Sequence, residues 1–420
     1  MRGELRGALA LAVVLGMAPS AQAQSAGTTN GNQAQAAKVK SGQGSATDAA
    51  MDMGAPPVQS YPKFTLDTLA NFELSGMAAD SGPSRGPQPY LRFDTIIDYD
   101  TSETLTFYGL FQFKARAPRP ADDPNNELFV NQGAGRKVGG KFKELYVRAG
   151  TWRIGKFVQD FGRAYVLLPG PFSADFIEEP DQGYEPSEMI GVEKLHVFGN
   201  EEHGWQQLSV SAFMVDRTFL HRSYPYDEGQ VHYRDGGVGN THLPTNIMAT
   251  WDALNVPVGH GAQASLQASV IRWGRTYGVP RGEFWSTLGG DITVPLDNSV
   301  RRTLQRRYTQ LRFYVEAARR ANFQGAIGRD RNWVTEAAEY MRGQWQFDLS
   351  STQRWTTDMV TPTQNDRIYT ATFAHNFPTQ SLLQFSVARE NVGDRAGVYA
   401  GMRLVQTITT CQRCARGPAY

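Results

Sequence analysis

The fold is decided by residues 141–193, which read KFKELYVRAGTWRIGKFVQDFGRAYVLLPGPFSADFIEEPDQGYEPSEMIGVE. From Glu144 to Ala149 polar and apolar residues alternate, with Leu145 and Val147 on the apolar side. This period of two is typical of a strand with one apolar and one polar face. A second alternating run, from Trp152 to Phe157, predicts a second strand with Trp152, Ile154 and Lys156 on one side.

A long excursion separates these two strands from the next one. It begins after Phe157, contains the Pro/Gly-rich passage 169–171, and ends where Ile190 starts a new apolar run. Gly and Pro in such a passage mark a loop rather than a strand. This order of elements predicts a barrel in which two strands are joined by a long loop. The loop is expected either to be extracellular or to fold into the pore.

The same stretch resembles a recurring block in outer-membrane porins of alphaproteobacteria. The resemblance rests on RIGKF at 153–157, DFGRA at 160–164, PG at 169–170, DF at 175–176 and IGV at 190–192. The GKF element is also similar to the equivalent strand of phosphate-selective porins. The resemblance implies an antiparallel transmembrane β-barrel in the outer membrane of a Gram-negative bacterium.

The N-terminus predicts export. Arg2 and Arg6 form a positive region, residues 8–17 are apolar, and Ala21-Gln22-Ala23 is a cleavage motif. These features predict a signal peptide at residues 1–23, because the apolar run is too short to span a membrane.

The chain divides into three parts after the signal peptide. Residues 24–60 are rich in small and polar side chains and predict a disordered periplasmic linker, because they offer too little apolar surface to offset their ordering entropy. Residues 61–410 are predicted to form the barrel, and residues 411–420 a C-terminal tail.

Alternating runs continue along the whole of the predicted barrel, and many have the length of about ten residues that a tilted strand needs to cross a bilayer. The candidate strands are 64–75, 90–98, 105–114, 141–149, 151–157, 190–198, 206–215, 247–254, 262–273, 282–294, 309–318, 333–341, 343–351, 368–376, 382–389 and 398–408. Beyond residue 23 the chain has no apolar run long enough for a membrane helix. We therefore expect an all-β, antiparallel transmembrane barrel of about 14 to 16 strands.

The sequence contains little that indicates catalysis or metal binding. The seven His residues show no H-x-x-x-H or H-E-x-x-H spacing. The one G-x-S-x-G match, at residues 82–86, lies between two predicted strands and not between a strand and a helix, which is the context of a nucleophile elbow. Cys411 and Cys414 form a C-x-x-C pair after the last strand, which predicts a small disulfide loop or, alternatively, two free thiols. We therefore expect neither an enzyme, a metal site nor a cofactor.

The excursion at 158–189 is too long for a periplasmic turn, so we expect it to narrow the pore. Seven residues are predicted to line the pore or its constriction: Arg148, Asp160, Arg163, Asp175, Glu178, Arg312 and Glu316.

The charge pattern predicts a weak preference for anions, because Arg in a water-filled lumen binds anionic groups. In the segment 301–331, basic residues outnumber acidic ones. The arginines that form this basic cluster are Arg301, Arg302, Arg306, Arg307, Arg312, Arg319, Arg320, Arg329 and Arg331. The alternative is that these are rim charges that contact lipid head groups or pair with acids in loops.

The function predicted from the sequence is that of an outer-membrane porin for passive diffusion of small hydrophilic solutes. Its expected partners are outer-membrane lipid and lipopolysaccharide, small solutes or anions, the barrel assembly machinery and two further copies in a homotrimer, but no nucleic acid. The alternatives are a barrel enzyme that hydrolyses lipids and a non-conducting assembly or export barrel.

Overall fold

A computed structural model describes most of the chain beyond residue 60. The described residues are 61–79, 85–116, 137–168, 170, 172–173, 175–178, 183–184, 186, 189–200, 202–221, 231–276, 278–296, 309–358, 364–393 and 395–412. The predicted signal peptide and linker lie outside these ranges, as do Cys414 and the arginines at 301, 302, 306 and 307. Predictions about them stay predictions.

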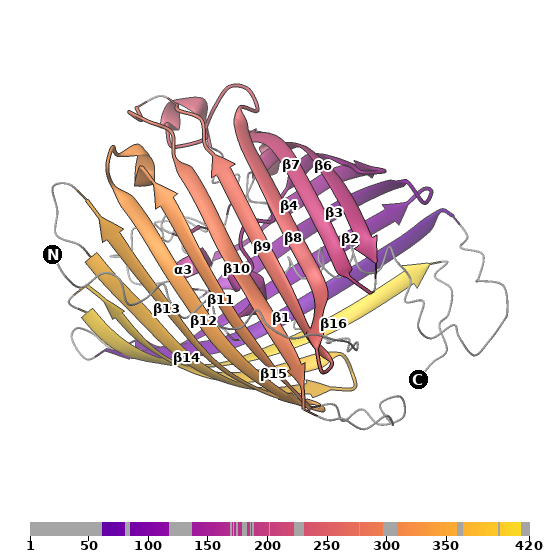
Figure 1. Ribbon diagram of the computed structural model, residues 1–420, viewed down its shortest axis with the longest axis vertical. Helices are drawn as coiled ribbons and strands as arrows, with labels where there is room; N and C mark the ends of the chain where they lie inside the picture. Colours follow the sequence, from indigo (N-terminus) through magenta and orange to yellow (C-terminus); the bar gives the residue numbers. More distant parts are fainter. Residues whose placement is uncertain are drawn as a thin grey trace.

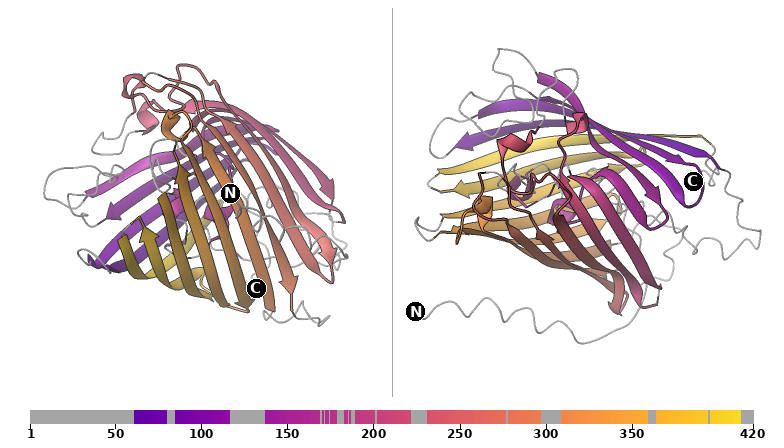
Figure 2. Two further views of the ribbon diagram at one scale, coloured as in Figure 1. Left: turned by 60° about the vertical axis from the view of Figure 1, so that its left-hand side comes forward. Right: turned by 90° about the horizontal axis from the view of Figure 1, so that it is seen from above.

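The described residues form sixteen antiparallel strands in one closed barrel (Figure 1). The strands are β1 (Lys63–Ala79), β2 (Arg85–Asp100), β3 (Leu105–Arg116), β4 (Lys137–Ala149), β5 (Trp152–Phe157), β6 (Met189–Asn200), β7 (Gly204–Val215), β8 (Asn246–Gly259), β9 (Ala262–Arg272), β10 (Phe284–Pro295), β11 (Thr309–Ala321), β12 (Asp330–Arg342), β13 (Trp345–Thr357), β14 (Gln364–Phe377), β15 (Ser381–Val392) and β16 (Arg395–Gln412). Each pairs with its neighbours in sequence, and β1 pairs with β16 to close the ring (Figure 2). Each candidate strand from the sequence overlaps one of these strands, so the predicted fold class is confirmed.

Five short helical turns lie in the described parts of the connections between strands. They are α2 (Ala164–Leu167), α3 (Asp175–Glu178), η4 (Phe219–His221), η5 (Tyr233–Asp235) and η6 (Phe323–Gly325). No helix among the described residues is long and apolar enough to cross a membrane.

The alternation of apolar and polar residues in the sequence places them on opposite faces of the barrel wall. On β11, Phe313 and Val315 are exposed on the outer face, whereas Tyr314 and Glu316 are buried on the inner face. Successive side chains of a strand point to opposite faces, so each strand presents apolar residues outward and mostly polar residues to the lumen. The predicted assignment of Leu145 and Glu144 to opposite faces of β4 is confirmed in the same way.

The two ends of the barrel carry different connections. The turns at 150–151, 260–261 and 343–344 are tight and lie at one end, which we call the short-turn rim. The connections 158–188 and 216–245 lie at the other end, which we call the long-loop rim.

Lys156 keeps the predicted alternation of β5 but is covered by another segment. The register pairs Ile154 with Val147 and Lys156 with the exposed Leu145 of β4, while the next residue, Phe157, packs on the inward Tyr146. The prediction that Trp152, Ile154 and Lys156 share one side therefore agrees with the register, and the burial of Lys156 comes from the β7–β8 connection.

The buried Lys156 attaches the β7–β8 connection to the end of β5. Its Nζ lies 2.8 Å from Asp216 Oδ2 and donates to Leu220 O at 3.0 Å. Both side chains of the ion pair are fully buried. A buried charge without its partner is very unfavourable, so this pair fixes the connection over the short strand β5.

Replacing Lys156 by Met should destabilise the barrel, because it leaves Asp216 buried without its cation. We expect a loss of about 3 to 5 kcal/mol, seen as a lower temperature for the gel-mobility change of the heat-unfolded barrel. The matched control is Lys194→Met, which removes an exposed lysine from the outer face of β6. Equal transition temperatures for both variants would contradict the assigned role.

Candidate functional site

We call the connection between β5 and β6, residues 158–188, the inner loop, and its described residues fold into the lumen (Figure 1). Near its start, Gln159 Oε1 accepts a hydrogen bond from Ser211 Oγ of β7, and Asp160 O accepts one from Thr250 Oγ1 of β8. Further along, Phe176 O accepts a bond from Trp333 Nε1 of β12 at 3.2 Å. The loop therefore crosses the interior and contacts inward-facing side chains of distant strands.

Glu316 of β11 anchors the first half of the inner loop. Its Oε2 accepts the Arg163 backbone N–H at 2.6 Å, and its Oε1 accepts the Ala164 N–H at 3.4 Å. Tyr184 Oη donates to the same Oε1 at 2.5 Å, from near the end of the loop. One carboxylate, only 1% exposed, thus binds both ends of the loop.

Glycine allows the loop to approach this carboxylate. Gly162 has a φ of 75°, and a Cβ there would lie 2.9 Å from Glu316 Oε1. On the other side, a Cβ at Gly289 of β10 would lie 2.9 Å from Oε2. A side chain at either position would displace the carboxylate from its donors.

Aromatic side chains fill the space between the inner loop and the wall at β10–β12. Phe161 packs on Trp285 with ring centroids 5.8 Å apart, and Tyr184 packs edge-on against Trp333 at 5.2 Å. Tyr165 is buried in the same cluster. Such rings bury large apolar areas, so this part of the lumen is packed rather than open.

Two predicted residues, Arg163 and Arg312, lie close to acidic partners on the inner wall. Arg163 Nη1 lies 3.0 Å from Asp291 Oδ1, and Arg312 Nη2 lies 2.6 Å from Glu339 Oε2. Arg312 also donates to Leu167 O of the inner loop at 3.4 Å. Both arginines keep about a fifth of their side-chain surface exposed (19% and 18%), so they face the remaining open lumen.

The other predicted residues are placed less closely together. Asp160 lies at the start of the inner loop, and Arg148 lies near the short-turn rim, where Nη2 donates to Thr106 Oγ1 at 3.2 Å. Asp175 and Glu178 are the first and last residues of α3, but their side chains are outside the described part of the chain. Their position at a constriction stays a prediction.

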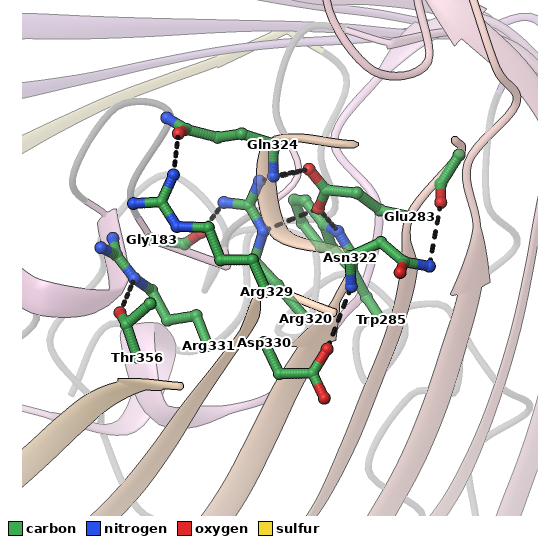
Figure 3. Close-up of polar contacts among 11 residues, drawn as sticks. Gly183, Glu283, Trp285, Arg320, Asn322, Gln324, Arg329, Asp330, Arg331 and Thr356 are labelled. Carbon is green, nitrogen blue, oxygen red and sulfur yellow. Dashed lines mark hydrogen bonds and ion pairs between the residues drawn. The ribbon is translucent and has the colours of Figure 1, made fainter. Parts of the chain in front are cut away.

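Polar partners, several of them acidic, bind the described arginines of the predicted basic cluster near the long-loop rim (Figure 3). Arg320 forms a two-point ion pair with Glu283, at 3.0 and 3.2 Å, and donates to Gly183 O of the inner loop at 2.6 Å. Glu283 also accepts the Gln324 N–H. This cluster therefore supports the alternative reading, in which the cations pair with acids.

The neighbouring Arg319 and Arg354 also form ion pairs, whereas Arg331 bonds to a hydroxyl group. Arg319 lies 2.6 Å from Asp330 Oδ2, and Arg354 lies 2.9 Å from Asp366 Oδ2. Arg331 donates to Thr356 Oγ1 at 2.8 Å (Figure 3).

Apart from Glu316, the carboxylates of the inner wall are not among the residues predicted to line the pore. Among the described strand side chains, those facing inward with negative charge are Asp67, Glu73, Asp94, Asp98, Asp100, Glu144, Glu193, Asp252, Asp291, Glu316, Glu339, Asp348, Asp366 and Glu390. Those with positive charge are fewer: Lys63, Arg92, Lys141, Arg148, Arg153, Arg312, Arg320, Arg331, Arg354 and Arg403. Asp94, Asp98 and Asp100 are separated by even numbers of residues on one strand, so they share a face. This spacing was the signal from which a carboxylate-lined inner face could have been predicted.

The remaining predictions concern metals and cysteines. No group of three or more potential ligands is placed to hold a metal ion among the described residues. Cys411 lies in β16, which extends to Gln412, past the predicted barrel boundary at residue 410. Its disulfide with Cys414 stays a prediction because Cys414 is not described.

Comparisons with known proteins identify similar folds. No protein-family model matches the chain, and no curated protein is a significant match. The high-pH structure of OprB from Pseudomonas putida aligns over 83% of this chain and 94% of its own, with a TM-score of 0.54 and 10% identity. The outer-membrane channel DcaP of Acinetobacter baumannii aligns over 82% and 96% (TM-score 0.49, 11% identity), and an anion-selective porin from Comamonas acidovorans over 82% and 99% (TM-score 0.48, 11% identity). At such identities, the likeness to OprB shows the barrel fold alone.

Replacing Glu316 by Ala should loosen the inner loop without opening the barrel wall, because the carboxylate bonds only to the loop in the contacts above. We expect faster tryptic cleavage after Arg163 in detergent-solubilised protein whose barrel still resists heat. Glu336→Ala, on the outer face of the neighbouring strand, is the control. Unchanged cleavage at Arg163 would show that other contacts hold the loop.

Proposed function

We propose that the chain is an outer-membrane channel through which small hydrophilic solutes diffuse passively. The observation that carries this proposal is a closed barrel with a polar, charged inner wall and a loop folded across its lumen. Charged groups along such a passage would select solutes by size and charge. The fold shared with OprB supports the proposal.

The outer wall supports a place in a membrane. Leu288, Leu349 and Val387 have exposed fractions of 58%, 50% and 53%, and they lie on different strands of the same outer face. An apolar surface this extensive is unfavourable in water but is covered by lipid in a transmembrane barrel. Export by the signal peptide, assembly by outer-membrane machinery and a homotrimer are further parts of this proposal.

Channel activity is the direct test. Full-length protein incorporated into a planar lipid bilayer should give stepwise increases in current. This separates a channel from the two alternatives, a lipid hydrolase and a non-conducting assembly barrel. A correctly folded barrel that gives no current steps would contradict the proposal.

Deleting residues 167–177 should raise the single-channel conductance. The deletion removes the part of the inner loop that reaches Trp333 but keeps the backbone groups of Arg163 and Ala164 that bind Glu316. A wider lumen carries more ions per unit time. The control is heat-modifiable gel migration of the deleted form, and a folded barrel with unaltered conductance would show that this part of the loop does not limit flow.

The charges of the inner wall bear on whether the channel prefers anions or cations. The sequence predicts a weak anion preference, but the described inner wall carries more carboxylates than cations, and many of the cations are paired with acids. An excess of one charge in a passage favours counter-ions. We therefore propose a weak preference for cations.

Reversal potentials in a potassium chloride gradient measure this preference. We expect cation selectivity in the unaltered protein and less of it in Asp67→Asn, which neutralises a part-exposed inward carboxylate of β1. Glu336→Gln, whose side chain lies on the outer face, should leave the potential unchanged. Anion selectivity of the unaltered protein would restore the original prediction.

A further inference from the structure

Three outward-facing residues at the short-turn rim lie in one row across neighbouring strands, and we call them the rim row. The register pairs Arg342 of β12 with Trp345 of β13, and Trp345 with His375 of β14 (Figure 1). Neighbouring strands lie about 4.8 Å apart. Arg342 and His375 are therefore about 10 Å apart at the backbone, with the tryptophan between them.

Aromatic rings surround His375 on the outer wall. The Trp345 ring lies 4.0 Å from the His375 ring and 5.1 Å from the Phe373 ring, measured between centroids. Phe377 packs edge-on against His375 at 4.5 Å. Trp345, Phe373 and Phe377 all remain exposed on the outer face. An exposed tryptophan at the end of a strand is typical of the interface between membrane and water.

The rim row lies where the apolar outer wall ends. The next outward residues toward the middle of the wall are Tyr340 on β12 and Phe347 on β13, and both are exposed. On the other side of the row, the chain turns through Gly343 and Gln344. The row therefore marks the level where hydrocarbon gives way to head groups.

The guanidinium of Arg342 is not balanced by a carboxylate among the described residues. Arg342 is exposed and forms no hydrogen bond or ion pair there. The described outward residues of β11 to β15 include two acids, Asp330 and Glu336, both on β12. Asp330 pairs with Arg319 at 2.6 Å. Glu336 lies six residues from Arg342, which is about 20 Å along a strand.

We propose that the rim row binds the phosphate group of a phospholipid in the leaflet at the short-turn rim. A guanidinium binds phosphate oxygens through two parallel hydrogen bonds, and the His375 ring and the indole N–H of Trp345 are further donors. Short turns of such barrels face the periplasm, so this is the periplasmic leaflet. The proposal rests on the membrane location given above but not on channel activity.

The surroundings of the rim row favour a lipid over other occupants. A phospholipid carries acyl chains beside its phosphate, and the exposed rings of Phe373 and Phe377 offer apolar surface next to the row. Free phosphate would leave that surface unused. A second copy that docked through the same strands would have to present a carboxylate at this level, whereas Asp330 and Glu336 lie six or more residues away along β12.

Native mass spectrometry of the full-length protein in neutral detergent tests the binding. The probe is phosphatidylglycerol, compared with a diacylglycerol of the same acyl chains, which lacks the phosphate. We expect phosphatidylglycerol to bind more tightly, and Arg342→Gln to weaken its binding by about fivefold. Adding His375→Leu to that variant should weaken binding further.

The matched control is Arg367→Gln. Arg367 is an exposed outward arginine of β14 near the opposite, long-loop rim, so its replacement removes the same charge without touching the rim row. This variant should bind phosphatidylglycerol as the unaltered protein does. An equal loss in both variants would show that net charge, rather than the rim row, attracts the lipid.

Three further outcomes would overturn the proposal. One is equal binding of the two lipids. Another is displacement of phosphatidylglycerol by inorganic phosphate at millimolar concentration, which would indicate a site for free phosphate. The third is a change of oligomeric state in Arg342→Gln without added lipid, which would assign the row to contact between copies. Current steps in a planar bilayer test the channel separately, so a loss of lipid binding in a variant that still conducts leaves the proposed function intact.

Discussion

The interior of this barrel depends on the bonds that the Glu316 carboxylate makes to the inner loop. A buried carboxylate is stable only when its oxygens are fully hydrogen-bonded, and here two backbone N–H groups and a tyrosine hydroxyl supply the donors. These bonds hold the loop at the depth where Phe161 and Tyr184 pack against the wall. From this position the later segment of the loop reaches β12, where Phe176 O accepts a hydrogen bond from Trp333.

The strands could be predicted from the sequence because alternation is a local property. Each residue of a run such as Leu311 to Ala317 takes its face from its neighbours, and the barrel keeps that assignment. The alternation does not show that Lys156 is fully buried, because the β7–β8 connection that covers it comes from a distant part of the sequence.

The candidate site was predicted only in part, because its contacts join distant residues. Arg163, Arg312 and Glu316 were identified as inward-facing, but the sequence does not show that Glu316 binds the loop 153 residues earlier. It also does not show that Arg320 pairs with Glu283, which turns a cationic cluster into a set of ion pairs. Charge counting along a sequence treats every charge as independent, whereas the fold decides which charges neutralise one another.

The position of the inner loop also constrains the order in which the protein can fold. The loop follows the fifth strand, yet the groups that hold it come from later strands, including Ser211, Thr250, Glu316 and Trp333. Contacts between residues so far apart in sequence form late, because a long segment of chain must first be closed. The contacts that hold the loop therefore cannot be complete until these later strands are in place.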